Sequence, residues 1–297
     1  MAKKRDLQIP KTAIIGAGGF LGSRLMAAHR AIYPNCVGTY YSSGKPVLDL
    51  LKPDITHLNL SSTGHENVII AAGVIDVYKC EWEKEYTYPR NVTGTLELIR
   101  QIIEEGLKPI FISTDWVFRG DTGNYNDNAI PDPICGYGTQ KAEVEKIIPQ
   151  ICKDNYLIVR LSRLFSFKKG DKSTPDQIAY LLSLGKKVRA ARDQVFGPLL
   201  VDDAVKAIMS LQRARATGIV NINSPEIWSR LQLAYEIADA MGVNRNLIES
   251  ISLDDLNDNI PRPKRTNMIC NRLKKLAPMD FTPMSQCIKH IVANYKD

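Results

Sequence analysis

The sequence predicts an α/β fold in which a doubly wound parallel sheet carries a smaller C-terminal α/β lobe. Short apolar, β-branched runs alternate with longer amphipathic stretches, as strands and helices do when helices cover both faces of a parallel sheet. A glycine-rich turn also joins the first apolar run to the first helix, which is typical of sheets that bind a nucleotide at their carboxyl edge. These two observations fix the order in which the elements are considered.

The first strand is predicted at residues 12–15, and the turn that follows it has the form G-x-x-G-x-x-G. Without Cβ atoms the backbone can approach a diphosphate closely, and the helix running on to about Ala31 adds amide groups and the positive end of its dipole. The strand before the turn and the helix after it favour a phosphate site over an ordinary turn. The expected nucleotide contacts here are Gly16, Gly19, Phe20, Leu21 and Gly22.

The end of the second strand, at residues 37–41, bears on the choice of cofactor. An Asp or Glu at this point binds the ribose 2′-hydroxyl of NAD, but this chain has no acid there. Ser42, Ser43 and Lys45 stand in its place, and the ammonium favours the 2′-phosphate of NADP. The alternative is a solvated loop that accepts NADH as well.

Two further strands are expected at residues 47–50 and 67–73. The first would bring Asp49 and Leu50 to the adenine of the cofactor. The second ends in small residues, where a nucleotide must pass close to the backbone. Those residues are Ala71, Ala72 and Gly73. A helix at 81–105 then leads to a strand at 109–115.

The strand at 109–115 and the helix beginning near Tyr137 carry the residues expected to perform chemistry. Tyr137 and Lys141 lie one helical turn apart, so both side chains can point at one spot. A nearby ammonium favours phenolate and would lower the pKa of Tyr137, which suits proton transfer. Thr114 would hydrogen-bond the same substrate oxygen. The alternative is that Tyr137 is a half-buried helix residue and Lys141 is solvated.

Together these segments resemble an extended short-chain dehydrogenase/reductase. The resemblance rests on the glycine turn, Ala71-Ala72-Gly73, Asn91, Ser113-Thr114 and Tyr137-x-x-x-Lys141. More narrowly, the run from Ser113 to Gly120 is similar to the S-T-D-Y-V-F-x-G run of dTDP-4-dehydrorhamnose reductases, with Trp116 in place of the usual Tyr. The resemblance implies a Rossmann-type fold, NADPH as the cofactor, and Asn91 among the cofactor-binding residues, helping to position a water that returns the proton to Tyr137.

The C-terminal part is expected to form the substrate side. The run from Asp193 to Pro198 resembles the family's D-Q-x-G-x-P segment, and residues 261–268 are similar to its R-P-x-x-S-x-L signature. Arg262 and Arg265 would bind a substrate diphosphate, since a guanidinium matches phosphate oxygens in a fork. Their alternative is a solvated loop. The remaining expected substrate contacts are Asp115, Trp116 and Gln194.

The expected division of the chain follows from this order of segments. Residues 1–165 would form the NADP-binding domain, with 190–225 returning to it. Residues 226–297 would form the substrate-binding lobe, together with 166–189. The further elements expected are strands at 155–161 and 218–223, and helices at 176–184, from 201, and at 229–241.

Composition limits the classes of protein. The chain has 297 residues, of which 44% are hydrophobic and 24% charged, as in a soluble globular protein. A net charge of +7 spread along the chain fits a phosphorylated ligand and is weak support for nucleic acid. The six Cys and four His have no metal-ligand spacing, so reduced thiols in the cytoplasm and no metal are expected. No signal peptide or membrane span is expected, and a homodimer is a guess from frequency alone.

The resemblance implies NADPH-dependent reduction of a nucleotide-linked 4-keto-6-deoxy sugar, most simply dTDP-4-dehydrorhamnose to dTDP-L-rhamnose. Hydride would go to the carbonyl carbon, Tyr137 would protonate its oxygen, and Lys141 would also hold the nicotinamide ribose. One alternative is another nucleotide-sugar reductase or an epimerase with the same Thr-Tyr-Lys set. Another is a non-catalytic NADP-binding regulatory subunit, since that of methionine adenosyltransferase resembles the same family.

Overall fold

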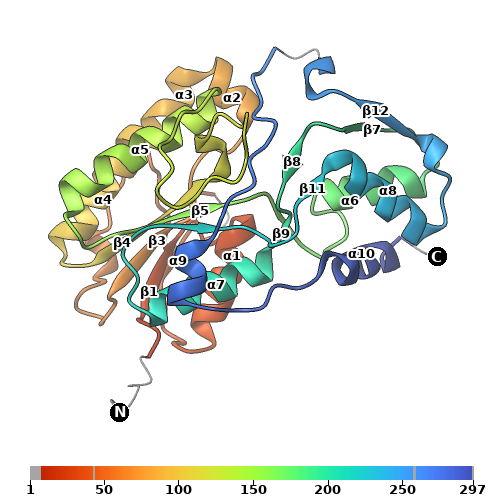
Figure 1. Cartoon of the computed structure of the whole chain (residues 1–297). Helices are drawn as coiled ribbons and strands as arrows, with labels where there is room; N and C mark the ends of the chain where they lie inside the picture. Colours follow the sequence, from red (N-terminus) through yellow and green to blue (C-terminus); the bar gives the residue numbers. More distant parts are fainter. Residues whose placement is uncertain (1–7, 43, 257–258, 296–297) are drawn as a thin grey trace.

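The computed structural model describes residues 8–42, 44–256 and 259–295, and its larger part is built on one parallel sheet (Figure 1). The six strands lie in the order β10-β5-β4-β3-β1-β2. They are β1 (Thr12–Ile15), β2 (Gly38–Thr39), β3 (Asn67–Ile70), β4 (Lys108–Thr114), β5 (Leu157–Leu161) and β10 (Gly218–Ile222). The winding reverses between β1 and β3, and ligands of such sheets bind at the carboxyl ends beside this reversal. The predicted doubly wound α/β fold is confirmed.

Helices cover both faces of the sheet, which is why its central strands are buried and mostly apolar (Figure 1). One face packs against α1 (Phe20–Arg30), α7 (Val201–Arg213) and α9 (Asn271–Leu276). The other face packs against α4 (Thr95–Glu104) and α5 (Gly136–Cys152). The short helices α2 (Val77–Trp82) and α3 (Lys84–Tyr88) extend this second layer. The two apolar cores hold the carboxyl edge of the sheet rigidly between them.

The smaller lobe has its own apolar core and lies beside the carboxyl edge of the sheet (Figure 1). Its helices are α6 (Thr174–Ser183), α8 (Arg230–Met241) and α10 (Met284–Ala293). Its strands pair as β7 (Val188–Ala191) with β12 (Ile248–Ile251) and β8 (Val195–Phe196) with β11 (Trp228–Ser229). A short parallel pair, β6 (Leu164–Phe165) with β9 (Leu199–Leu200), joins lobe and sheet.

Two predicted elements take a different form. Residues 47–50 make no strand, since only a single bridge joins Tyr40 to Val47 and the Asp49 carboxylate accepts a hydrogen bond of 2.9 Å from the Leu51 amide in a turn. The predicted helix at 81–105 is interrupted twice before α4. Glu83 has non-helical backbone angles, and Pro89, which has no N–H to donate, opens a π-helical segment at Pro89–Gly94.

The expected division of the chain into two domains stays a prediction. In the structure, β10 pairs at the edge of the main sheet and α7 packs on its face. The strand β8 pairs with β11 of the lobe, and α9 packs against β10 and α7. All six cysteines are free and buried. None of the helices in the described ranges has the length and apolar character that a membrane span requires.

Candidate active site

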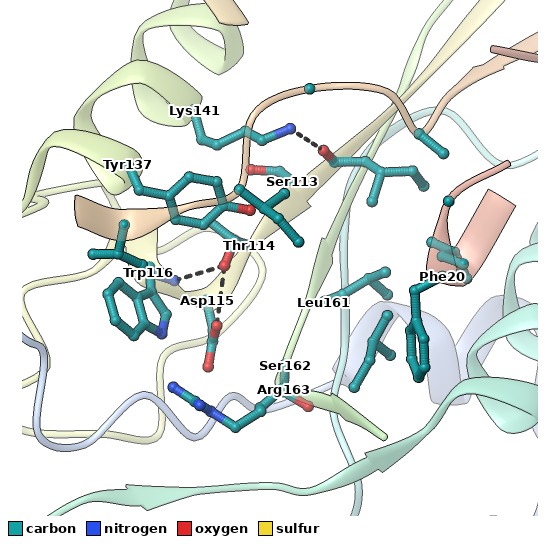
Figure 2. A pocket seen from close by; sticks show the side chains of 18 of the residues that line it. Phe20, Ser113, Thr114, Asp115, Trp116, Tyr137, Lys141, Leu161, Ser162 and Arg163 are labelled. Carbon is teal, nitrogen blue, oxygen red and sulfur yellow. Dashed lines mark hydrogen bonds between the residues drawn. The ribbon is translucent and has the colours of Figure 1, made fainter. Parts of the chain in front are cut away.

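A cavity of about 520 Å³ opens at the carboxyl ends of β1, β3, β4 and β5 and extends to the lobe (Figure 2). Its walls come from segments that are far apart in the sequence. They include Gly19–Leu21, Ala71–Gly73, Thr114–Trp116, Tyr137, Lys141, Ser162–Leu164 and Asp171–Ser173. The sheet therefore brings the expected catalytic residues, part of the expected cofactor turn, and Asp115 and Trp116 to one place.

Thr114, Tyr137 and Lys141 meet at the sheet side of this cavity (Figure 2). The Thr114 hydroxyl accepts a hydrogen bond of 3.2 Å from the Trp116 amide and donates one of 3.1 Å to the Asp115 carboxylate. The same hydroxyl also hydrogen-bonds the Tyr137 phenol. The Lys141 ammonium donates to the Ile112 carbonyl at 2.9 Å. These contacts hold three polar side chains toward the same volume.

The electrostatics of Tyr137 differ from the expectation. Burial raises the pKa of the phenol, and the neighbouring Asp115 carboxylate raises it further, against a smaller opposing effect of the Thr114 hydrogen bond. Burial lowers the pKa of Lys141 to about 8, although Glu145 favours its charged form. The predicted lowering of the Tyr137 pKa by Lys141 is therefore not found in this structure, where the ammonium is bonded to the Ile112 carbonyl.

A buried ion pair behind Lys141 was not predicted. Glu145 follows Lys141 by one turn of α5, and its carboxylate lies 2.7 Å from the Arg160 guanidinium of β5. The side chains of Arg160 and Glu145 are 1% and 2% exposed, so both charges lie in the interior. Glu145 also accepts a hydrogen bond of 2.5 Å from Ser113, and Arg160 donates to the Ala129 carbonyl. The pair thus joins α5 to the strands β4 and β5.

The glycine turn has the close packing that its sequence predicted. Gly16 has a φ of +88°, and a Cβ atom there would lie 2.8 Å from the Ala72 amide nitrogen. A Cβ on Gly22 would lie 2.1 Å from the Gly16 carbonyl oxygen, so the first turn of α1 can be this close only to glycine. Among the other residues expected at the cofactor, Gly19, Phe20, Leu21, Ala71, Ala72 and Gly73 line the cavity.

The residues expected around the adenosine end lie away from this cavity. Ser42 and Lys45 are exposed in the loop after β2, and Ser43 lies outside the described residues. Leu50 is buried, and the Asp49 carboxylate is bonded within its own turn. Their contact with a nucleotide stays a prediction.

Asn91 makes structural hydrogen bonds here, and its expected part in binding the cofactor stays a prediction. It is 3% exposed and is not among the residues lining the cavity. Its amide oxygen accepts from the Val74 N–H at 2.7 Å, and its amide nitrogen donates to the Val74 carbonyl and to Gln140 of α5. With its amide group used in this way, Asn91 fixes the loop after β3 against the catalytic helix and is poorly placed to hold a water for Tyr137.

On the lobe side, Arg262 is grouped with two arginines that sequence reasoning missed, Arg163 and Arg230. Burial lowers the pKa of Arg230 to about 10, and the positive charges of Arg163 and Arg262 lower it further. Arg163 directly follows β5, and Arg230 is the first residue of α8. These positions, after a strand and at the start of a helix, were the one feature of the sequence that could have indicated a binding role for the two residues. Arg163 lines the cavity, whereas Arg230 and Arg262 are not among its lining residues, and Arg265 is exposed.

Gln194 is 6% exposed, and its side-chain oxygen has no hydrogen-bond partner among the described residues. Its backbone carbonyl accepts from the Arg230 amide at 2.9 Å, which places it beside the arginines. The part of the chain that the structure describes contains no group of three or more His, Cys, Asp or Glu side chains able to hold a metal ion.

A doubly wound sheet with a glycine-rich turn and a Thr-Tyr-Lys set at its carboxyl edge defines an extended short-chain dehydrogenase/reductase. Within this class, residues 11–297 match the family model described as RmlD substrate binding domain, and the chain belongs to that family. The resemblance drawn from the sequence is confirmed at this level.

Three similar proteins agree with this placement. A hypothetical dTDP-4-dehydrorhamnose reductase from Sulfolobus tokodaii superposes with a TM-score of 0.78 at 30% identity, over 93% of this chain and 98% of its own. A probable low-salt glycan biosynthesis reductase of Haloferax volcanii is 29% identical over 85% of this chain and 87% of its own length. The dTDP-4-dehydrorhamnose reductase of Bacillus anthracis, solved with NADP, has a TM-score of 0.81 at 23% identity, over 97% and 100% of the two chains, which supports the fold.

Proposed function

We propose that this chain uses NADPH to reduce the 4-keto group of a nucleotide-linked 6-deoxy sugar, most simply dTDP-4-dehydrorhamnose to dTDP-L-rhamnose. The observation that carries the proposal is the cavity itself, which has Thr114, Tyr137 and Lys141 on one side and Arg163, coupled to Arg230, on the other. Membership of the RmlD family and the reductases among its relatives support the same reaction.

The residues at the nucleotide side fit NADPH. Gly19, Phe20 and Leu21 line the cavity at the start of α1, where amide groups and the helix dipole favour an anion such as a diphosphate. Ser42 and Lys45 lie at the end of β2, where a 2′-phosphate would be bound. When bound, NADPH supplies the hydride for the carbonyl carbon.

The protein's own contribution is proton transfer and orientation. The Tyr137 phenol keeps its proton at neutral pH because burial raises its pKa, so it is ready to protonate the oxygen that becomes negative during reduction. Thr114 orients that oxygen through its hydroxyl. Lys141, which lines the same cavity, would hold a ribose hydroxyl of the cofactor.

The arginines on the lobe side fit the substrate diphosphate. The Arg230 Nε atom is buried and has no hydrogen-bond partner among the described residues, and two other guanidiniums crowd it. A dianion placed between them would satisfy this nitrogen and relieve the repulsion. Gln194 and Trp116 would complete the contacts with the nucleotide sugar.

The reaction is tested by following NADPH oxidation with enzymatically prepared dTDP-4-keto-6-deoxy sugar, with and without the matching epimerase. Turnover that requires the epimerase would establish both the reduction and the L-configured substrate. Retention of the cofactor with exchange at a second sugar carbon would indicate an epimerase instead. Tight NADPH binding without turnover of any nucleotide keto sugar, together with a stoichiometric partner in pull-downs, would indicate a regulatory subunit.

Replacing Arg230 by methionine is expected to raise the KM for the nucleotide sugar about 10- to 100-fold, the range for losing a charge-assisted hydrogen bond. The KM for NADPH should stay near that of the unmodified protein. Arg265→Met serves as the matched control, because Arg265 is exposed and is not grouped with Arg163 and Arg230. An equal rise in the KM for the nucleotide sugar in both variants would instead support binding of the substrate diphosphate by Arg262 and Arg265, as expected from the sequence.

A further inference from the structure

Every reduction at this site leaves Tyr137 as a phenolate that must regain a proton before the next turnover, so the source of that proton is part of the mechanism. This inference rests on the proposed reduction. The amide group of Asn91 is bonded to Val74 and Gln140, which argues against a water held by Asn91. The route therefore has to be sought among the groups that touch Tyr137.

One acidic group reaches Tyr137 through a single intervening side chain. The Asp115 carboxylate accepts a hydrogen bond of 3.1 Å from the Thr114 hydroxyl (Figure 2). That hydroxyl also hydrogen-bonds the Tyr137 phenol. Asp115 is only 3% exposed but still lines the cavity. It can thus exchange protons with water in the cavity while facing Thr114.

The hydrogen-bond capacity of Thr114 allows a transfer in this direction. A hydroxyl has one proton to donate and two lone pairs to accept with. One lone pair is used by the Trp116 amide at 3.2 Å. When Asp115 is protonated, its O–H can donate to the second lone pair, and the Thr114 proton is then free to turn to Tyr137. Asp115, Thr114 and Tyr137 therefore stay within their hydrogen-bonding capacity throughout the transfer.

We propose that Asp115 supplies, through the Thr114 hydroxyl, the proton that Tyr137 loses in each turnover. The Thr114 O–H bond breaks as a new O–H bond forms on the phenolate, and the Asp115 O–H bond breaks as Thr114 regains its proton. The product is a neutral phenol, an unchanged threonine and an Asp115 carboxylate. The Asp115 carboxylate then regains a proton from water. This is the one proton that each reduction consumes.

The surroundings of Asp115 give its carboxyl a suitable acidity. Burial raises its pKa to about 6, while the Thr266 hydrogen bond, the Arg163 charge and the Thr114 hydrogen bond oppose the rise. The groups that face it are thus Arg163 after β5, Thr266 in the C-terminal segment, and Thr114 and Tyr137. Arg230 and Arg262 affect the Asp115 carboxyl indirectly, because their charges interact with that of Arg163. A carboxyl of this kind is partly protonated near neutrality and is a far stronger acid than a phenol.

Lys141 is the competing proton source, and its different pKa distinguishes the two routes. Burial places the Lys141 pKa at about 8, and Glu145 and Cys80 favour its charged form. A steady-state rate limited by Asp115 should fall as the pH rises through about 6, whereas a rate limited by Lys141 should hold until about 8. The alkaline limb of the rate profile therefore reports the donor.

The test compares the first turnover with the following ones in Asp115→Asn. An asparagine keeps the size of the side chain and still accepts from Thr114, but it has no acidic proton. With NADPH bound and saturating keto sugar, the steady-state rate divided by the first-turnover rate is expected to fall at least about tenfold relative to the unmodified protein. Thr266→Val, which removes another hydrogen bond of Asp115 but keeps the route, should leave this ratio near that of the unmodified protein.

Equal slowing of the first and later turnovers in Asp115→Asn would overturn the proposal and leave Asp115 a purely structural role. An alkaline limb near pH 6 that survives in Asp115→Asn would overturn it as well. A further readout needs no substrate. A carboxylic acid infrared band should titrate near pH 6, disappear in Asp115→Asn and shift in Thr114→Val. If no keto sugar is turned over but this band behaves as expected, the proposed reduction is wrong and the hydrogen-bonded coupling of Asp115 to Thr114 is upheld. If the band is absent, that coupling is wrong as well.

Discussion

Tyr137→Phe is expected to lower kcat for keto-sugar reduction by about 10²- to 10⁴-fold, the usual contribution of a positioned general acid. The phenylalanine ring keeps the edge contact with Trp116, whose ring centre lies 6.3 Å from that of Tyr137, but it has no proton to give. Stopped-flow measurement of NADPH oxidation would determine the loss. The dissociation constant for NADPH should change little, because the glycine turn is untouched.

Tyr78→Phe is the matched control, since Tyr78 lies on the nearby α2 with its side chain largely exposed. This variant is expected to reduce the keto sugar at the unmodified rate. Retention of full activity by Tyr137→Phe would remove Tyr137 from the mechanism, and with it the route through Asp115 and Thr114.

Arg160→Met is expected to lower the free energy of unfolding by about 3–5 kcal/mol, because it leaves the Glu145 carboxylate buried without its partner. Among the described residues, Ser113 would remain as the hydrogen-bond donor to that carboxylate. Denaturant unfolding with an unchanged m-value would measure the loss. The same change also leaves Glu145 as an unopposed negative charge one turn from Lys141.

The double variant Glu145→Met, Arg160→Met separates an unpaired charge from lost packing. Because it leaves neither charge alone in the interior, it should be more stable than Arg160→Met by itself. Arg119→Met, which breaks an exposed pair with Asp132, should leave the unfolding curve where it is. Arg160→Met that unfolds like the unmodified protein would show that the interior charge is compensated by other groups.

Local sequence patterns were sufficient for much of this protein. The Tyr137–Lys141 spacing fixes both residues on one side of α5 whatever the rest of the chain does. The glycines of the first turn predict a close approach because only their lack of a Cβ atom permits it. In the same way, β-branched apolar runs predicted the central strands, since these are buried on both faces.

Features that depend on contacts between residues far apart in the sequence could not be predicted from local sequence patterns. Residues 47–50 have a strand-like composition but obtain only one bridge, because strand formation requires a neighbouring strand in register. Asn91 has the residue type for holding a water, yet Val74 and Gln140 use its hydrogen-bonding groups. The residue type alone does not tell which partner is nearest.

The sequence by itself therefore determined the doubly wound sheet, the glycine turn, the Thr-Tyr-Lys set and the family. Only the tertiary structure decided that Arg163 and Arg230 join Arg262, that Arg160 pairs with Glu145, and that Asp115 reaches Tyr137 through Thr114. The physical reason is that periodicity and backbone conformation are properties of neighbouring residues. Charge pairing, burial and the resulting pKa shifts arise only when distant segments are packed together.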